Sequence, residues 1–343
     1  MSVTIQAAKK SFGGAPAIDG VDAEIGPGEF FVVLGPSGCG KSTLLRLIAG
    51  LETLDEGHIA LGDRPVSGPG LHVAPEDRKV GVVFQSYALW PHMSVLDNVA
   101  FPAEAQGASR RAAREAARRQ LETVDLAAHA DRHPAALSGG QRQRVALARC
   151  LAGGAETVLM DEPLANLDPH LRNRMEEELA DFHARSGVTT IYITHDQREA
   201  MALATRVAVM GQGRFLQVAS PQELHDRPIS EEVARFIGRA AVLDALAEGD
   251  SVRIGPFTVP ALPNPGDASP AAPGPGRVVV RPGDVRLGGG MPARLSSAFY
   301  RGGQWEGLAE VAGLTEPLPV TSDRPIRAGE ALEVALRGAW LLP

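Results

Sequence analysis

The feature that most constrains the fold is a glycine-rich segment, Gly35-Pro-Ser-Gly-Cys-Gly-Lys41-Ser42-Thr43. It follows an apolar run, Phe30–Leu34, and leads into a pattern that predicts a helix extending towards Gly50. In a strand–loop–helix of this kind, glycines let backbone N–H groups turn inwards at the partly positive helix N-terminus. We therefore expect a phosphate-binding loop (P-loop) at this position.

Two side chains of this loop are expected to complete a nucleotide phosphate site. Lys41 is expected to reach the β- and γ-phosphates, and the Ser42 hydroxyl is placed to bind Mg²⁺. Lys occurs only at positions 9, 10, 41 and 79, so a Lys here indicates that a compact charge is needed. The alternative, a glycine-rich turn with an incidental Lys, would arise on the order of once in 200 such sequences. Cys39 is interpreted as a small loop residue and not as a nucleophile.

Short apolar runs between helix-like stretches predict the architecture around this loop. The predicted strands are Phe30–Leu34, Val80–Phe84, Thr157–Met160, Thr189–Thr194 and Val207–Met210. Runs that are apolar on both faces favour a largely parallel sheet covered by helices on both sides, an α/β fold. A long helical region, Ala103 to Leu151, predicts an inserted helical subdomain, about 86–152. Arg110, Arg114 and Arg118 share one of its helix faces, which we interpret as solvated.

The pattern changes after about Gly238. Ser251–Val259, Arg277–Leu287 and Ala331–Leu336 are short and strand-like, with turn signals and a Pro/Gly-rich loop, Pro263–Gly276, between them. This predicts a small all-β domain C-terminal to the α/β domain. The expected domains are 1–235 for nucleotide binding and 236–343 for the β domain.

Charge and composition exclude some classes of function. The net charge of −7 over 343 residues argues against nucleic acid as a partner, which favours a basic face. Two cysteines cannot form a disulfide framework in a chain of this size, so a reducing compartment is expected. No run approaches the roughly 18 to 20 apolar residues of a membrane span, and Met1–Lys10 lacks a signal-peptide core. We therefore expect any membrane role to come through a partner.

Polar residues at the ends of the predicted strands indicate the rest of the site. Val158-Leu-Met-Asp161-Glu162 is an apolar strand that ends in two carboxylates. Asp161 is expected to hold the magnesium shell, and Glu162 to polarise the attacking water as a general base. Gln85 is expected to reach Mg²⁺ or that water, and His195 to bond the γ-phosphate, because ligands of open α/β sheets collect at such strand ends.

A second glycine-rich segment, Leu137-Ser138-Gly139-Gly140-Gln141, precedes a predicted helix that runs to about Leu151. Small residues at a helix N-terminus form an anion site, although an ordinary N-cap is the simpler interpretation. Two phosphate-type sites in one chain are explained if two copies face each other and each lends this loop to the other's nucleotide. Phe12 is a candidate for stacking on adenine, and a core position is the alternative.

In chain order, the segments Gly35–Thr43, Gln85, Leu137–Gln141, Val158–Glu162, Ala165-Asn-Leu-Asp168 and His195 resemble the motif set of ABC-transporter ATPases. In that family's terms they are the Walker A, Q-loop, signature, Walker B, D-loop and H-loop motifs. The resemblance covers roughly residues 1 to 235, with every motif present and in order. The later part, including Arg277-Val-Val-Val-Arg-Pro-Gly-Asp284-Val, resembles the TOBE-type β-domain of importer ATPases.

The resemblance implies a P-loop NTPase fold, with an OB- or TOBE-like domain behind it, that binds ATP and Mg²⁺. It also implies an ATP-sandwich dimer of two copies. The implied catalytic residues are Lys41, Gln85, Glu162 and His195, and the implied Mg²⁺ ligands are Ser42, Gln85 and Asp161. The implied nucleotide-binding residues are Phe12, Gly35, Pro36, Ser37, Gly38, Cys39, Gly40, Lys41, Ser42, Thr43, Gln85, Ser138, Gly139, Gly140, Gln141 and Asp168.

The resemblance further implies a motor subunit that energises solute uptake by an ABC importer, peripheral on the cytoplasmic face of the inner membrane. Its expected partners are transmembrane permease subunits and, indirectly, a solute-binding protein. The segment Ser86–Met93 is expected to meet the permease through Tyr87 and Trp90, where relatives usually have Phe in place of Trp90. The segment Tyr87–Pro102 and the short tail favour iron(III) or a polyamine as cargo.

Three other classes of protein remain as alternatives. A non-transport ABC ATPase acting on ribosomes or DNA usually has two cassettes or a long coiled coil, and this chain has neither. A nucleotide-binding regulator without turnover predicts a missing Glu162 or His195, and both are present. An exporter motor is disfavoured by the C-terminal β domain.

Overall fold

The computed structural model describes residues 1–165, 168–262 and 271–343. The chain divides into two compact units, Met1–Pro221 and Gln222–Pro343. The predicted domain boundary between residues 235 and 236 stays a prediction. Asn166 and Leu167 of the predicted D-loop, and residues 263–270 of the predicted Pro/Gly-rich loop, lie outside the described residues.

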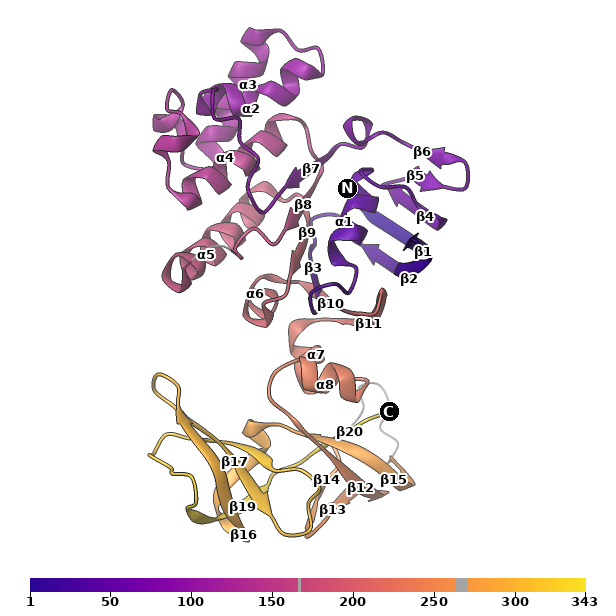
Figure 1. Ribbon diagram of the computed structural model, residues 1–343, viewed down its shortest axis with the longest axis vertical. Coiled ribbons are helices and arrows are strands. Elements are labelled where there is room, and N and C mark those ends of the chain that lie inside the picture. The colour runs from indigo at the N-terminus through magenta and orange to yellow at the C-terminus, as the bar shows by residue number, and fades with distance from the viewer. Residues whose placement is uncertain (166–167, 263–270) are drawn as a thin grey trace. The chain divides into compact units, whose positions relative to one another are not determined.

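A six-stranded sheet forms the centre of the first unit (Figure 1). Five of its strands run parallel, and β11 pairs antiparallel with β10 at one edge. In spatial order the strands are β11 (Arg214–Ala219), β10 (Arg206–Gly211), β3 (Phe30–Leu34), β9 (Thr189–Thr194), β8 (Thr157–Asp161) and β7 (Val80–Val83). The predicted parallel sheet is therefore confirmed.

Helices cover both faces of this sheet, which is why every residue of β3 and β9 is buried. On one face, α1 (Lys41–Ala49) shares a core with Phe31 of β3 and Ile191 of β9. On the opposite face, α5 (Pro169–Ser186) places the His183 ring edge-on to Phe30 at 5.0 Å. The short helix α6 (Gln197–Leu203) packs on the same strands.

A second sheet of the first unit was missed in the sequence. It is antiparallel, and its apolar face encloses α1 in the core that the central sheet shares. Its strands in order are β2 (Ala15–Ile25), β1 (Val3–Phe12), β4 (Glu56–Leu61), β5 (Arg64–Gly68) and β6 (Leu71–His72). The pairing of β1 with β2 contains three register shifts, and Ala7 has a φ of 46°, so the period-2 pattern that marks a strand is interrupted.

The inserted helical subdomain contains three α-helices that stand together beside β7 (Figure 1). They are α2 (Val95–Ala105), α3 (Arg110–Thr123) and α4 (Gly139–Ala152), with 3₁₀ turns at Ala127–His129 and Pro134–Ala136 between the last two. On α3, the Arg114 Nε donates to Asp97 Oδ1 at 2.9 Å and an exposed Arg119–Glu115 pair spans one turn. None of the described helices has the length and apolar content of a membrane span.

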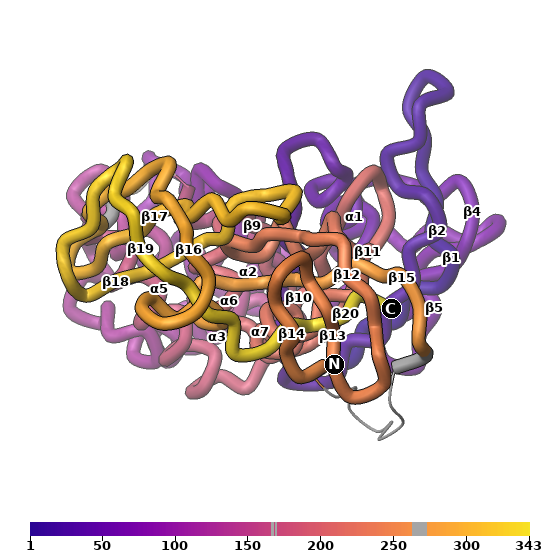
Figure 2. The backbone as a smooth tube through the Cα atoms, turned by 90° about the horizontal axis from the view of Figure 1, so that it is seen from below, coloured from indigo at the N-terminus to yellow at the C-terminus, as the bar shows by residue number. Residues whose placement is uncertain are grey.

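The second unit begins with two short helices, α7 (Pro221–Asp226) and α8 (Glu231–Phe236), and continues as a small all-β domain. One sheet has the order β14 (Phe257–Pro260), β13 (Ser251–Ile254), β12 (Ala241–Gly249), β15 (Ala271–Val280), β20 (Trp340–Leu341). The other has the order β18 (Leu318–Ser322), β17 (Trp305–Val311), β16 (Val285–Tyr300), β19 (Ala331–Leu336). The two sheets share one apolar core, and the last strand, β20, returns to pair with β15 (Figures 1 and 2). The predicted all-β domain is confirmed.

The segment predictions in this unit need three corrections. Ser251–Val259 is not one strand but the hairpin of β13 and β14, because Gly255 turns the chain with a φ of 52°. Arg277–Leu287 spans the end of β15, a 3₁₀ turn and the start of β16. Ala271–Gly276 belongs to β15, although its proline and glycine content predicted a loop.

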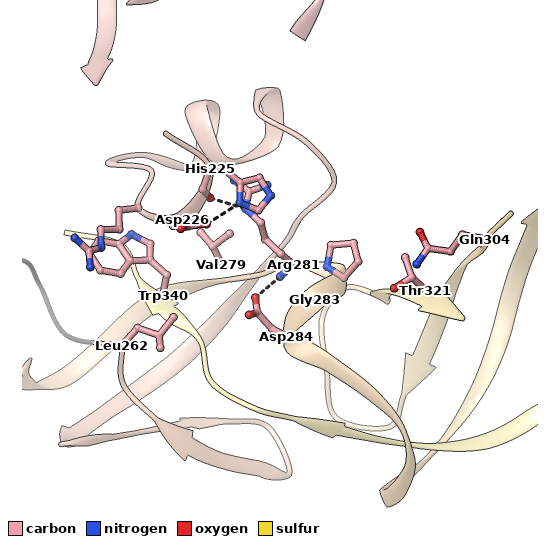
Figure 3. Close-up of a pocket in the computed structure, with 12 residues that line it drawn as sticks. His225, Asp226, Leu262, Val279, Arg281, Gly283, Asp284, Gln304, Thr321 and Trp340 are labelled. Atoms are coloured by element: carbon pink, nitrogen blue, oxygen red, sulfur yellow. Dashed lines mark hydrogen bonds and ion pairs between the residues drawn. The ribbon is translucent and has the colours of Figure 1, made fainter. Parts of the chain in front are cut away.

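A cavity of about 690 Å³ in the second unit is lined by Arg281, His225, Asp284 and Trp340, among others (Figure 3). Arg281 is 5% exposed, and its Nε donates to the His225 carbonyl at 2.7 Å. Its backbone N–H donates to Asp284 Oδ2 at 2.8 Å, and burial raises the pKa of that carboxyl. Arg281 therefore ties the α7 segment to the turn between β15 and β16.

One buried arginine organises the end of α1. Arg78 is 2% exposed and donates to the carbonyls of Leu47 and Ile48 at 2.9 and 3.0 Å. It also donates to the Val73 carbonyl at 2.8 Å and to Ser67 Oγ at 2.8 Å. Burial lowers the pKa of Arg78 to about 10, so the guanidinium remains charged at neutral pH. A positive charge at the C-terminus of a helix stabilises the helix.

We predict that Arg78→Met lowers the free energy of unfolding by about 2–4 kcal/mol, because several buried carbonyls lose their donor. Urea unfolding of the purified chain checks this. Arg119→Met, on the exposed face of α3, is the control and is expected to change stability by less than about 0.5 kcal/mol. Equal stability of the two variants would contradict the capping role of Arg78.

Candidate nucleotide-binding site

The loop between β3 and α1 has the backbone that its glycines predict. Gly38 and Gly40 have φ values of 82° and 111°, which side chains rarely tolerate. A Cβ at Gly35 would lie 2.3 Å from the Met210 carbonyl oxygen, and one at Gly40 would lie 2.3 Å from that of Ala17. The glycines are therefore needed by the geometry of the loop itself, and Pro36, Ser37 and Gly38 form its exposed rim.

Lys41 begins α1 and folds back over the loop. Its Nζ donates to the carbonyls of Gly35 and Pro36 at 2.8 and 2.9 Å, and the residue is 5% exposed. These bonds hold the ammonium group at the loop. Cys39 of the same loop is buried, and burial raises the pKa of its thiol, in keeping with a packing role. Thr43 follows in the first turn of α1.

Ser42 and Asp161 meet although they are far apart in the sequence. The Ser42 hydroxyl donates to Asp161 Oδ1 at 3.0 Å, which links the first turn of α1 to the end of β8. A hydroxyl and a carboxylate are the hard oxygen ligands that Mg²⁺ prefers, and Mg²⁺ usually completes its shell with water and phosphate oxygens. Among the described residues there is no group of three or more His, Cys, Asp or Glu that would form an all-protein metal cage. The pair fits a phosphate-bound Mg²⁺.

Glu162 and His195 are neighbours at the ends of β8 and β9. Glu162 Oε2 lies 3.1 Å from His195 Nδ1, and the Glu162 N–H donates to the Ile193 carbonyl at 3.0 Å. Glu162 has a φ of 45°, an uncommon conformation for a residue other than glycine. Such strain collects at functional sites, because the surrounding structure must hold it in place.

The second glycine-rich segment begins α4. Ser138 Oγ accepts from the Gln141 N–H at 3.3 Å, and Gln141 Oε1 accepts from the Ser138 N–H at 2.9 Å, a capping box. A Cβ at Gly140 would lie 2.4 Å from Met175 Sδ, so this glycine permits the packing of α4 on α5. The N-cap interpretation is thus correct within one chain, and the Ser138 side chain is exposed. Gly139 is the first residue of α4.

Three other predicted residues lie on the surface of the first unit. Phe12 is 50% exposed with the Lys10 ammonium 5.3 Å from its ring centre, so the core alternative is wrong. Asp168 caps α5, because its Oδ1 accepts from the N–H groups of His170 and Leu171. Gln85 is exposed just after β7. The nucleotide and metal roles of Phe12, Asp168 and Gln85 stay predictions.

The expectation that Tyr87 contacts a membrane partner is wrong. Tyr87 is buried, its φ of 60° turns it inwards, and its hydroxyl donates to the Pro163 carbonyl at 3.2 Å. Its own carbonyl accepts from Arg149 Nη2 at 2.9 Å, and that of Ala88 accepts from Nη1 at 2.6 Å. Arg149 was not predicted from the sequence, although an arginine at a position on the apolar face of a predicted helix is a signal of a buried polar role. Tyr87 therefore connects the segment after β7 to the segment after Glu162.

Trp90 remains a surface candidate. Its ring packs on Phe101 with centroids 4.5 Å apart, and the Arg149 guanidinium lies 5.1 Å from the ring centre. Phe101 and Phe84 are about 40% exposed. This part of the first unit thus presents aromatic side chains beside the strand that leads to Gln85.

Comparisons with known proteins identify relatives of this chain. A family profile described as ABC transporter matches residues 18–165. The chain is 47% identical over 260 residues to the trehalose/maltose import ATP-binding protein of Thermococcus litoralis, covering 74% of this chain and 70% of that protein. It is 44% identical over 300 residues to the spermidine/putrescine import ATP-binding protein of Pseudomonas aeruginosa, covering 85% and 80%. A solved dimeric structure of a bacterial ABC transporter cassette matches with a TM-score of 0.55 and 29% identity, covering 64% of this chain and 98% of that one.

Proposed function

Because this chain belongs to the ABC transporter family, as the ATP-binding subunit of an importer, we propose that it hydrolyses ATP between its P-loop and the ends of β8 and β9. The observation that supports this best is the convergence of two pairs, Ser42 with Asp161 and Glu162 with His195. The first pair suits a metal-bound phosphate, and the second suits activation of a water molecule.

In the proposed site, the P-loop N–H groups and Lys41 bind the phosphates. Ser42 and Asp161 would hold Mg²⁺, with Gln85 as a further ligand, and the ion would neutralise charge on the β- and γ-phosphate oxygens. With a proton on Nδ1, His195 donates to Glu162 Oε2 and leaves the other carboxylate oxygen to accept the proton of the attacking water. Such a contact orients Glu162 as a general base. The proposed bond of His195 to the γ-phosphate would need a further proton on Nε2.

The site is proposed to be completed by a second copy of the chain. Ser138 is exposed at the N-terminus of α4, where N–H groups and partial positive charge favour an anion. The dimeric structure of the related cassette supports such pairing. We infer that Ser138, Gly139 and Gly140 of one copy approach the γ-phosphate bound by the other, and that Asp168 lies near the same interface.

The family also associates with permease subunits at a membrane. We infer that this chain acts on the cytoplasmic face of the inner membrane and that a solute-binding protein delivers the cargo from outside. The cargo we propose is iron(III) or a polyamine. Relatives of similar identity are named for a polyamine and for disaccharides, so the ligand of the binding protein encoded beside this chain is the observation that decides it.

We predict that Glu162→Gln slows ATP hydrolysis by about 10²–10⁴-fold, because the amide cannot accept the proton of the water. ATP affinity should be retained, and an ATP-bound dimer should accumulate. Phosphate release measures the rate of hydrolysis, and gel filtration with ATP measures the dimer. Glu156→Gln, at an exposed ion pair with Lys79, is the control and should behave as wild type. Normal turnover of Glu162→Gln would remove Glu162 from the role of base.

We predict that Trp90→Ala leaves the ATPase activity of the isolated subunit within about threefold of wild type and weakens assembly with the permease, because aromatic anchors dominate interfaces. Trp90→Phe preserves a ring against Phe101 and should assemble normally. Co-purification from membranes and uptake assays measure assembly. If Trp90→Ala loses basal hydrolysis while assembly stays normal, Trp90 is not a partner contact.

A further inference from the structure

A buried carboxylate lies behind the Glu162–His195 pair. Glu199 is the third residue of α6 and is 2% exposed. Its Oε2 accepts from the Tyr192 hydroxyl and from the Thr194 hydroxyl, each at 2.7 Å. A carboxyl group this deeply buried requires hydrogen-bond partners, and these two hydroxyls both belong to β9. Burial, with the Glu199 charge as a further cause, raises the pKa of Tyr192 well above its ordinary value, so Tyr192 remains a donor.

The Thr194 hydroxyl connects this carboxylate to the residues on either side of His195. A hydroxyl has one proton, and here Thr194 donates it to Glu199. The lone pairs of the same oxygen accept the N–H of Asp196 at 2.9 Å. The side chain of the residue before His195 is thereby bonded to the backbone of the residue after it. Without an acceptor at Glu199, the hydroxyl is free to rotate and this link is no longer held.

The same network reaches α5. Arg172 Nη1 donates to Asp196 Oδ2 at 3.2 Å, and its Nε lies 3.8 Å from Glu199 Oε1. Asp168, the N-cap of α5, is the residue proposed to lie near the dimer interface. Glu199 therefore contacts β9, the strand that His195 directly follows, and α5, the helix that follows the proposed interface segment.

We infer that Glu199 is a positioning residue for ATP hydrolysis: by fixing the Thr194 hydroxyl and through it Asp196, it holds His195 Nδ1 3.1 Å from Glu162 Oε2. The inference rests on the proposed function of Glu162 and His195. Glu199 acts through Thr194 and not on the nucleotide. The simpler reading is that Glu199 only attaches α6 to β9, in which case its loss would reduce stability without a specific effect on turnover.

The test measures single-turnover ATP hydrolysis, the KM for ATP and thermal unfolding of full-length variants. Glu199→Leu and Thr194→Val are each expected to lower kcat by about 10- to 100-fold with KM within about twofold, because small misplacements of catalytic groups have effects of this size. Glu199→Gln, whose amide oxygen can accept both protons, should stay within about fivefold of wild type, and Thr194→Ser should also retain activity. The Glu199→Leu/Thr194→Val double variant should be no slower than the slower single variant, because both changes break one linkage.

Tyr192→Phe is the matched control. It removes the other hydroxyl bonded to the same Glu199 oxygen without touching Thr194, so kcat should stay within about threefold of wild type even if stability falls. A kcat for Tyr192→Phe as low as that for Thr194→Val would favour the purely structural reading and overturn the inference. If Glu199→Leu does not fold, Thr194→Val against Thr194→Ser decides the question.

His195→Ala separates this inference from the proposed function. If His195→Ala is inactive while Thr194→Val turns over normally, the positioning inference alone is overturned. If His195→Ala itself hydrolyses ATP normally, the proposed role of His195 is overturned and the inference with it. Slow turnover of His195→Ala, Thr194→Val and Glu199→Leu, with rescue in Glu199→Gln, supports both.

Discussion

The parallel register of β3, β8 and β9 is the constraint on which the site depends. Leu34 pairs with Thr194, and Asp161 pairs with Ile193, so the three strands end at the same edge of the sheet. At this edge lie the P-loop after β3, Asp161 and Glu162 at the end of β8, and His195 after β9. Ligand sites in open α/β sheets are expected at this edge. A shift in the register of one strand would separate Ser42 from Asp161 or Glu162 from His195.

Several residues that were predicted to bind a ligand also stabilise the fold of a single chain. Ser138 and Asp168 cap α4 and α5, and Gly140 makes room for Met175. Helix caps leave further N–H groups at the same helix ends, so a capped N-terminus can still receive an anion. Capping and nucleotide binding are therefore compatible. Only an experiment with two copies of the chain tests whether these residues also bind a nucleotide. Glu199 similarly joins α6 to β9 while it orients the segment that contains His195.

The sequence predicted the features that local pattern determines. Fully buried strands such as β3 and β9, and the glycines of the P-loop, follow from periodicity and backbone conformation. The antiparallel sheet was missed because β-bulges interrupt β1. Tyr87 was misplaced because its orientation depends on one unusual φ, and Arg78 was missed because its carbonyl partners at the end of α1 lie far away in the chain. Glu199 was missed because its burial and its bonds to β9 arise only when α6 packs on that strand. Burial of a polar side chain depends on tertiary partners, and a single sequence does not reveal them.

In the proposed dimer, Ser138 of one copy completes the site that contains Glu162 of the other copy. Single-round ATP cleavage by purified mixed dimers, with differently tagged copies, tests it most directly. A dimer of Ser138→Arg with Glu162→Gln places both lesions in one composite site and leaves the other intact, whereas wild type paired with the double variant damages both sites. If the site is shared between the two copies, the first dimer cleaves more ATP. More cleavage in the second, whose wild-type copy would keep an intact site if Ser138 acted within its own chain, would contradict it.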